Sequence, residues 1–334
     1  MISMNDSQDL TARDAVHPPN FFVIGVVKGG TTSLYHYLDQ HPEIYLPPIK
    51  ETNHFAAKDI IEENFLDGYA QDVRINLDAY IKSGMKQQVH IAHVDSPDHY
   101  NALFSKVKNE KAIGEISNSY MICPSSASEI HTFNPSAKIL VVLRNPIRRA
   151  WSQYLMNLRE SKSSAPDFIE ELQKDHRANP KGWGVNHQYL ELGMYAKQLK
   201  SYIDLFGKDR VLPIFYEQYR DNPNDVLRRI SEFLEVDPNY TFDFSSESNK
   251  ASMPRSKVLN KLLVSSGLVK AVKDLTPKKL RSGFAKILYS DRNMPSIMPA
   301  EVDWLRAYYA QEVKDLSELI EQDAGEYWAD FKED

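Results

Sequence analysis

The chain has 334 residues and carries 40 Lys and Arg against 46 Asp and Glu, which gives a formal net charge of −6 at pH 7. A hydrophobic content of 42%, with 11% aromatic residues, is enough for a sizeable core and excludes a globally disordered chain. The single cysteine, Cys123, excludes an internal disulfide and a cysteine-rich metal site. The acidic balance argues against a protein that simply coats nucleic acid, so no nucleic-acid partner is expected.

The N-terminal segment is polar and has neither the basic start nor the apolar run of a signal peptide. No stretch approaches the roughly 18 consecutive apolar residues of a transmembrane helix. We therefore expect a soluble, cytoplasmic protein. Residues 1–19 are predicted to form a flexible tail and residues 20–334 a single domain.

Three short apolar runs predict buried strands, at Phe21–Gly25, Lys138–Leu143 and Val211–Phe215. Each run is followed by apolar residues at helical spacing, most clearly Trp151, Tyr154, Leu155 and Leu158 after the second run. This alternation predicts an α/β fold, a P-loop-like three-layer sandwich with a central, mostly parallel sheet and helices on both faces. Ligands bind such sheets beyond the carboxyl ends of the strands.

The loop after the first strand has the composition of a phosphate cradle. Its candidate residues, all small or polar, are Lys28, Gly29, Gly30, Thr31, Thr32 and Ser33. Glycines let backbone N–H groups turn toward a ligand, and the helix that follows favours an anion at its N-terminus. The standard P-loop has lysine directly after the last glycine, whereas Thr31 stands there in this chain and Lys28 lies inside the loop.

The second strand ends in a basic residue. A nucleotide kinase would hold Mg²⁺ with an acidic side chain near such a strand end, whereas this strand is followed by Arg144. An arginine there suits a second phosphate, to which Arg144 offers a planar fork and Ser152 a hydroxyl. We expect Arg148 and Arg159 to lie on a solvated helix face. A nucleotide or small-molecule kinase with an altered P-loop remains an alternative.

The segments GVVKGGTTSLYHYL, HPEIYLPPIKETNHF and LRNPIRRAWSQY together resemble the sulfotransferases that use 3′-phosphoadenosine 5′-phosphosulfate (PAPS). The branch they are most similar to is that of the bacterial relatives of the heparan-sulfate-type enzymes, and the resemblance extends over about residues 21–256. It implies PAPS as the sulfuryl donor, PAP as the product, and no required metal. It also implies a bacterial host.

The resemblance assigns roles to individual residues. The loop from Lys28 to Ser33 would bind the 5′-phosphosulfate, Arg144 and Ser152 the 3′-phosphate, and Arg255 the phosphates of the same ligand. Glu51 holds the position of the catalytic base in the glycan branch. The segment GEISNSY, residues 114–120, is similar to a family pattern G-E-K-S-P-x-Y, but Ile116 stands where the family has a lysine close to the catalytic centre.

Sulfuryl transfer is expected to be in line, as in phosphoryl transfer. Lys28 and the loop amides are predicted to stabilise charge on the leaving group, and Glu51 to take the proton of the acceptor. His54 is the competing base, because in a helical turn it would face the same cleft as Glu51. Lys50 is expected only to flank the cleft.

The acceptor is expected to be a hydroxyl, with a sugar or glycan as the first hypothesis and a lipid or polyketide-like alcohol as the alternative. A catalytically idle nucleotide-binding module is a further alternative, against which Glu51 argues. The sequence leaves the oligomeric state open.

Positive charge is concentrated near the C-terminal end. Between Arg255 and Arg292 there are ten Lys and Arg and only two Asp and Glu. We predict a basic helical cap over residues 256–300. It would cover the α/β core with solvated lysines, contact PAPS or an anionic acceptor, or touch a membrane surface through residues 256–289.

Overall fold

A computed structural model describes residues 18–160, 162–163, 167–178, 183, 188–245, 253–254, 289–290 and 294–332. Arg255, nearly all of the predicted basic cap before residue 294, and residues 1–17 of the predicted tail lie outside these ranges. The α-helices are α1 (Thr31–Leu38), α2 (Asp67–Asp72), α3 (Leu77–Lys82), α4 (Pro97–Ala102), α5 (Ser119–Ile122), α6 (Ser126–Phe133), α7 (Pro146–Arg159), α8 (Phe168–Arg177), α9 (Tyr195–Phe206), α10 (Tyr216–Asp221), α11 (Pro223–Leu234) and α15 (Pro299–Ile320). Short 3₁₀ turns cover His54–Ala56, Glu62–Asn64, Glu191–Gly193, Lys208–Arg210, Ala324–Glu326 and Ala329–Phe331.

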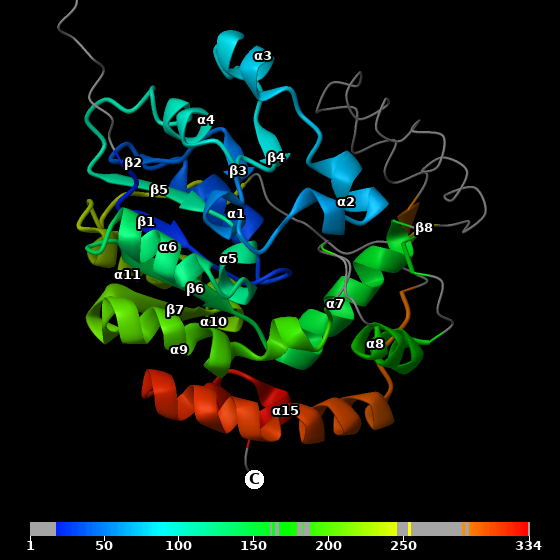
Figure 1. Ribbon diagram of the computed structural model, residues 1–334. Coiled ribbons are helices and arrows are strands. Elements are labelled where there is room, and N and C mark those ends of the chain that lie inside the picture. The colour runs from blue at the N-terminus through cyan, green and yellow to red at the C-terminus, as the bar shows by residue number, and fades with distance from the viewer. Residues whose placement is uncertain are drawn as a thin grey trace, which may run out of the picture.

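Five parallel strands form the central sheet, in the order β2-β5-β1-β6-β7 (Figure 1). They are β1 (Phe21–Val23), β2 (Ile44–Tyr45), β5 (Ala112–Ile116), β6 (Lys138–Leu143) and β7 (Val211–Phe215). The predicted bounds of β6 and β7 are confirmed. The strand β1 ends two residues before the predicted Gly25, although the amides of Ile24 and Val26 still donate to carbonyl groups of β6.

Alternate residues of β1 enter two separate cores, as the strand period of two requires. Phe22 packs into the larger core, which is completed by α6, α7, α9 and α15, while Phe21 and Val23 pack into a second core formed with α1 and α11. In Figure 1, α6 and α9 lie in front of the sheet and α15 runs along the outer side of α9. The predicted sandwich with helices on both faces is thus confirmed.

Two small sheets lie outside the central one. In the first, β3 (Ile49–Glu51) pairs in parallel with β4 (Val89–Ile91), and this pairing places Glu51 at the end of a buried strand. In the second, β8 (Met253–Pro254) pairs antiparallel with β9 (Tyr289–Ser290), and β8 contacts α7 (Figure 1). The chain on either side of the basic segment 255–288 therefore meets beside α7. None of the helices described here is long and apolar enough to cross a membrane.

Candidate functional site

The predicted phosphate loop joins β1 to α1, and its two glycines are both required by close contacts. A Cβ atom on Gly29 would lie 2.8 Å from the carbonyl oxygen of Val26, which accepts a hydrogen bond from the Gly29 amide. Gly30 caps α1 with φ 88°, a left-handed conformation, and a Cβ there would lie 3.0 Å from the ring of Tyr216. The loop therefore folds tightly, with backbone against Gly29 and an aromatic ring against Gly30.

The start of α1 turns its amide groups toward this loop. The first hydrogen bond within the helix runs from the Leu34 amide to the Gly30 carbonyl. The N–H groups of Thr31, Thr32 and Ser33 precede that bond, so they are the donors that a helix N-terminus offers to an anion. Thr31 is buried, and its hydroxyl accepts a hydrogen bond from the ammonium of Lys50 at 3.4 Å.

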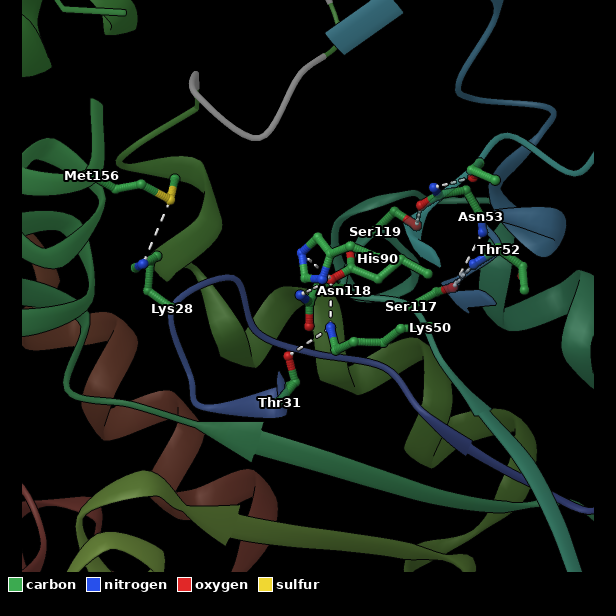
Figure 2. A network of polar contacts seen from close by, with 12 residues as sticks. Lys28, Thr31, Lys50, Thr52, Asn53, His90, Ser117, Asn118, Ser119 and Met156 are labelled. Atoms are coloured by element: carbon green, nitrogen blue, oxygen red, sulfur yellow. Dashed lines mark hydrogen bonds and ion pairs between the residues drawn. The ribbon is translucent and has the colours of Figure 1, made fainter. Parts of the chain in front are cut away.

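Lys28 lies on the other side of the loop, where its ammonium contacts the sulfur of Met156 at 3.5 Å (Figure 2). Its backbone has φ 69°, a left-handed conformation that a lysine adopts only when its surroundings impose it. Burial, and after it the charges of Arg159 and Arg144, lower the pKa of the Lys28 ammonium to about 8. Cations brought together in this way favour an anionic ligand among them.

Arg144 holds the loop in place from the end of β6. Its guanidinium donates from Nη1 to the Lys28 carbonyl at 2.7 Å, and it lies over the Tyr216 ring at 4.6 Å from the centroid. Its Nε atom is buried and has no hydrogen-bond partner in the described part of the chain. Burial lowers the pKa of Arg144. The Nε–H group of Arg144 can therefore donate to an additional acceptor, such as a ligand oxygen.

Ser152, the other predicted phosphate ligand, is half-buried on α7. It lies one turn before Met156, the residue that contacts Lys28, and so on the same face of the helix. Of the two arginines expected on a solvated face, Arg148 has a side chain that is 43% exposed and forms a paired contact with Asp330 at 2.6 and 2.7 Å. Arg159 lies near enough to Lys28 to affect its pKa.

Glu51, the predicted base, is buried at the end of β3 and shares its Oε1 atom among three groups. Lys50 donates to it at 2.6 Å, the amide of Asn118 donates at 2.9 Å, and the imidazole of His90 lies 4.0 Å away (Figure 2). No hydrogen bond to Oε2 is made within the described ranges, so that oxygen remains available to accept a proton. Lys50 is itself only 3% exposed.

The prediction that Lys50 only flanks the cleft is wrong. Its ammonium contacts both Thr31 of the phosphate loop and Glu51. One buried cation therefore links the loop that precedes α1 to the carboxylate at the end of β3. The charge-assisted bond to Glu51, at 2.6 Å, is short and strong, whereas the bond to Thr31, at 3.4 Å, is long and weak. Lys50 is therefore anchored on the carboxylate and reaches toward the loop.

The turn after Glu51 is held by the segment that follows β5. The hydroxyl of Ser117 accepts hydrogen bonds from the amides of Thr52 and Asn53, at 3.1 and 3.2 Å, and the hydroxyl of Ser119 donates to the Asn53 side chain at 2.6 Å (Figure 2). Asn118, between these two serines, stands where the family pattern has proline. Ser117, which matches the pattern, and Ser119, at its variable position, therefore hold the turn, and Asn118, which departs from the pattern, contacts Glu51 itself.

His54 does not share a helical turn with Glu51, because β3 ends at Glu51 and a 3₁₀ turn begins only at His54. Its imidazole stacks on Tyr100 with ring centroids 4.1 Å apart, and its Nδ1 atom contacts the Val94 carbonyl at 2.7 Å. Burial lowers the pKa of His54. The structure thus places His54 in an aromatic cluster and shows no contact between it and Glu51.

A small cavity adjoins Glu51. Its volume is about 20 Å³, room for one ordered water, and its walls include Glu51 and Val27, the residue before the phosphate loop. The lining residues are Val27, Glu51, Asn53, Tyr69, Ile91, Asn118, Ser119, Ile122, Trp183, Gln188 and Leu192. A more open hollow of about 250 Å³ shares Ile122, Trp183 and Gln188 with the cavity and adds Asp59, Asn64, Cys123 and Pro124.

Several of these residues were not predicted from sequence. Lys50 precedes Glu51, and Asn118 lies in the segment 114–120 that resembles a family pattern. Their positions in these motifs could have indicated that they belong to the site. Tyr69 and Trp183 belong to no motif and reach the site only through the fold. Among the residues that the structure describes, no three His, Cys, Asp or Glu side chains are grouped so that they could hold a metal ion.

Several known proteins are similar to this chain in sequence or in fold. Carbohydrate sulfotransferase 15 of Mus musculus is 26% identical over 271 residues, covering 72% of this chain and 47% of that protein. A bifunctional heparan sulfate N-deacetylase/N-sulfotransferase 4 from Mus musculus is 26% identical over 239 residues, covering 70% of this chain and 24% of that protein. The chain spans about half the length of the first of these relatives and less of the second.

Among solved structures, a sulfotransferase from Alicyclobacillus acidocaldarius is similar with a TM-score of 0.67 and 28% identity, over 93% of this chain and 99% of that one. A model of the sulfotransferase family matches residues 19–240, a range that contains the glycine loop, Glu51 and Arg144. The chain therefore belongs to the sulfotransferase family.

Proposed function

We propose that this protein transfers a sulfuryl group in line from PAPS to a hydroxyl of a carbohydrate, with Glu51 as the general base. Family membership supports the reaction class, and the names of the carbohydrate and heparan sulfate relatives support a sugar acceptor. The observation that carries the proposal is the buried contact of Lys50 with both Thr31 and Glu51. It joins an anion-binding loop to a carboxylate, which are the two parts that sulfuryl transfer to an alcohol requires.

The residues of the loop fit a doubly phosphorylated donor. Arg144 and Arg159 lie close enough to Lys28 for their charges to lower its pKa, and the Nε atom of Arg144 has no partner among the described residues, so it can donate to a ligand. The helix amides of Thr31, Thr32 and Ser33 would hold the phosphosulfate end, and Arg144 and Ser152 the 3′-phosphate. Arg255 is proposed to join them. When bound, PAPS supplies the sulfuryl group.

The chain's own residues then have separable tasks. Glu51 accepts the proton of the acceptor hydroxyl through Oε2, which makes no hydrogen bond to a described residue, whereas Oε1 is held by Lys50 and Asn118. Lys50 and Asn118 hold Oε1 and so fix the direction of the carboxylate. Lys28 and Lys50 lie on either side of the loop, where they stabilise negative charge that develops on the leaving phosphate. In this proposal side chains both take up the proton and stabilise the charge of the leaving phosphate.

Ligand binding separates this function from that of a kinase. Calorimetry and thermal melting are measured with PAP, and with ATP plus Mg²⁺. We expect PAP to bind and to raise the melting temperature, and ATP–Mg²⁺ to do so far less. Binding of ATP–Mg²⁺ with no response to PAP would contradict the proposal and favour the kinase.

The base is tested by Glu51→Gln, which keeps the shape of the side chain. We expect the rate of sulfuryl transfer from labelled PAPS to fall about a thousandfold, as for loss of a general base, while PAP affinity stays within about threefold. His54→Gln is the matched control and should keep most of the activity, because His54 is stacked on Tyr100. Full activity in Glu51→Gln would show that another group takes the proton.

A further inference from the structure

His90 lies beside the base on the strand that pairs with β3. The parallel register of β3 and β4 aligns Glu51 with Ile91, so His90 is the neighbour of Lys50 across the two strands. Its Nε2 atom lies 4.0 Å from the Oε1 atom of Glu51 (Figure 2). This histidine belongs to none of the motifs that the sequence analysis identified, and the functions assigned so far to the site do not use it.

The three groups around this oxygen differ in exposure. Lys50 and Asn118 are 3% and 7% exposed, whereas the side chain of His90 is 64% exposed. Neither ring nitrogen of His90 makes a hydrogen bond to a described residue. Because Glu51 is buried, an acceptor hydroxyl has to approach it from the open side, and there His90 offers unpaired ring nitrogens.

The distance between the two groups suits a substrate that contacts both. A separation of 4.0 Å is too long for a direct hydrogen bond between His90 and Glu51. It is short enough for two neighbouring hydroxyls of one sugar to reach the imidazole and the carboxylate at the same time. Contacts of this kind are often long in the free enzyme and shorten when the substrate binds.

The charges near His90 come from three elements. They are Glu51 and Lys50 on β3, Asp72 at the end of α2 and Glu160 directly after α7. Partial desolvation by the surrounding walls lowers the pKa of the imidazole from its usual 6.5, and Lys50 lowers it too, against the opposing effect of the carboxylates. The ring is therefore mainly neutral at pH 7, with one donor and one acceptor nitrogen.

We propose that His90 binds the acceptor: its neutral imidazole hydrogen-bonds a hydroxyl next to the one that Glu51 deprotonates, and its protonated form pairs with Glu51 and blocks the acceptor. The proposal rests on the function proposed above and deepens it. During turnover the proton of the reacting hydroxyl goes to Glu51 and the sulfuryl group to the hydroxyl oxygen, while His90 neither gains nor loses a proton. At acid pH the imidazolium and the carboxylate attract each other and compete with the acceptor.

The test uses the full chain, labelled PAPS, and heparan sulfate and p-nitrophenyl β-glucoside as two carbohydrate acceptors. His90→Ala should raise KM for the acceptor about tenfold at pH 7.5, as for loss of a substrate hydrogen bond, with PAP affinity within about twofold. His90→Gln keeps a neutral hydrogen-bonding group and should restore KM to within about threefold of wild type. His99→Ala is the matched control, because His99 also lies near a carboxylate, Asp78 at 3.0 Å, but on α4, so KM should not change.

The pH profile separates acceptor binding from a structural role. Below about pH 6.5, where His90 takes up a proton, kcat/KM of the wild type should fall by up to about tenfold per pH unit. His90→Gln cannot be protonated and should lose less activity over the same range. His90→Lys places a cation beside Glu51 at neutral pH and should lower kcat/KM about a hundredfold or more, by the same pairing.

The outcomes distinguish this inference from the proposed function. An unchanged KM in His90→Ala, with or without a lower melting temperature, would overturn the inference, as would the same loss at acid pH in wild type and His90→Gln. Either result would leave sulfuryl transfer by Glu51 intact. A protein that does not bind PAP, or that binds it and sulfates neither carbohydrate, would instead overturn the proposed function, and the role of His90 with it.

Discussion

The two sides of the proposed active site differ in charge and in how the chain builds them. On the donor side, the loop from Lys28 to Ser33 is contiguous, and it is surrounded by the cations Arg144 and Arg159. On the acceptor side, the walls come from separated segments, with Glu51 and Asp59 as the charged groups. Lys50 is buried between the two sides and contacts both.

This difference shows that the overall charge says little about the ligands. The net charge of −6 conceals a cationic donor site and an acidic acceptor site only a few side chains apart. A ligand with two phosphate groups gains from the cations of the first. Each prediction below changes one ionisable side chain in or near these two sides.

Lys50→Met should have the largest effect, because it cuts the connection between the two sides. We expect kcat to fall about a hundredfold or more, as for loss of one preorganised donor, and PAP affinity to fall by about tenfold. Lys50→Arg keeps the charge and should restore part of both. The measurements are steady-state transfer from labelled PAPS and calorimetry with PAP.

Lys58→Met is the matched control for the loss of one lysine. Lys58 also pairs with a carboxylate, Glu129 at 2.6 Å, but its side chain is 67% exposed. Exposed pairs contribute about 1 kcal/mol or less, so activity and PAP affinity should both stay within about twofold. Equal losses in the two variants would mean that Lys50 acts through general electrostatics, without a specific link.

A second prediction concerns Glu115, which lies behind the turn that holds Glu51. The hydroxyl of Thr52 donates to it at 2.7 Å, and burial raises the pKa of this carboxyl from 4.5 to about 7, against the opposing hydrogen bonds from Tyr120 and Thr52. The folded protein therefore holds this proton more tightly than the unfolded chain does. Stability from Glu115 is fully present below about pH 4.5 and is lost as the pH rises to about 7.

Glu115→Gln removes this titration while keeping an oxygen for Thr52. The free energy of unfolding of the wild type, relative to the variant, should fall by about 3 kcal/mol between pH 4.5 and 7. Urea unfolding of both proteins across that range provides the measurement. A constant difference would show that Glu115 stays ionised in its buried site, and hence that the acceptor side tolerates one more negative charge.

The fold could be predicted well where apolar runs are continuous. The bounds of β6 and β7 followed from such runs, whereas β5 was missed because Gly114 and Glu115 interrupt its apolar character. Glu115 is fully buried all the same, because hydrogen bonding and a raised pKa reduce the cost of its burial. Tertiary context here overrides the propensity of the segment.

The site was predictable only where its residues are contiguous. The glycine loop and Glu51 each lie in a sequence segment that resembles the family, so their roles could be predicted from that resemblance. Lys50 could not be assigned, because adjacent strand residues normally face opposite sides, and only the end of β3 allows it to meet Glu51. Tyr69 and Trp183 come together through pairing between the segment 64–66 and Trp183, which no local pattern signals.

The smallest expected effect tests the donor side, through the protonation of Lys28. In the free protein the pKa of Lys28 is lowered to about 8, chiefly by burial and then by Arg159 and Arg144. Bound phosphate groups would stabilise the ammonium and raise that pKa, so PAP affinity should be constant below about pH 8 and fall up to tenfold per pH unit above it. Calorimetry at pH 8.5, in two buffers of different ionisation enthalpy, should show proton uptake on binding. Lys28→Arg should abolish that uptake because arginine stays charged; uptake that persists would place the titrating group elsewhere and weaken the case for a cationic donor site centred on Lys28.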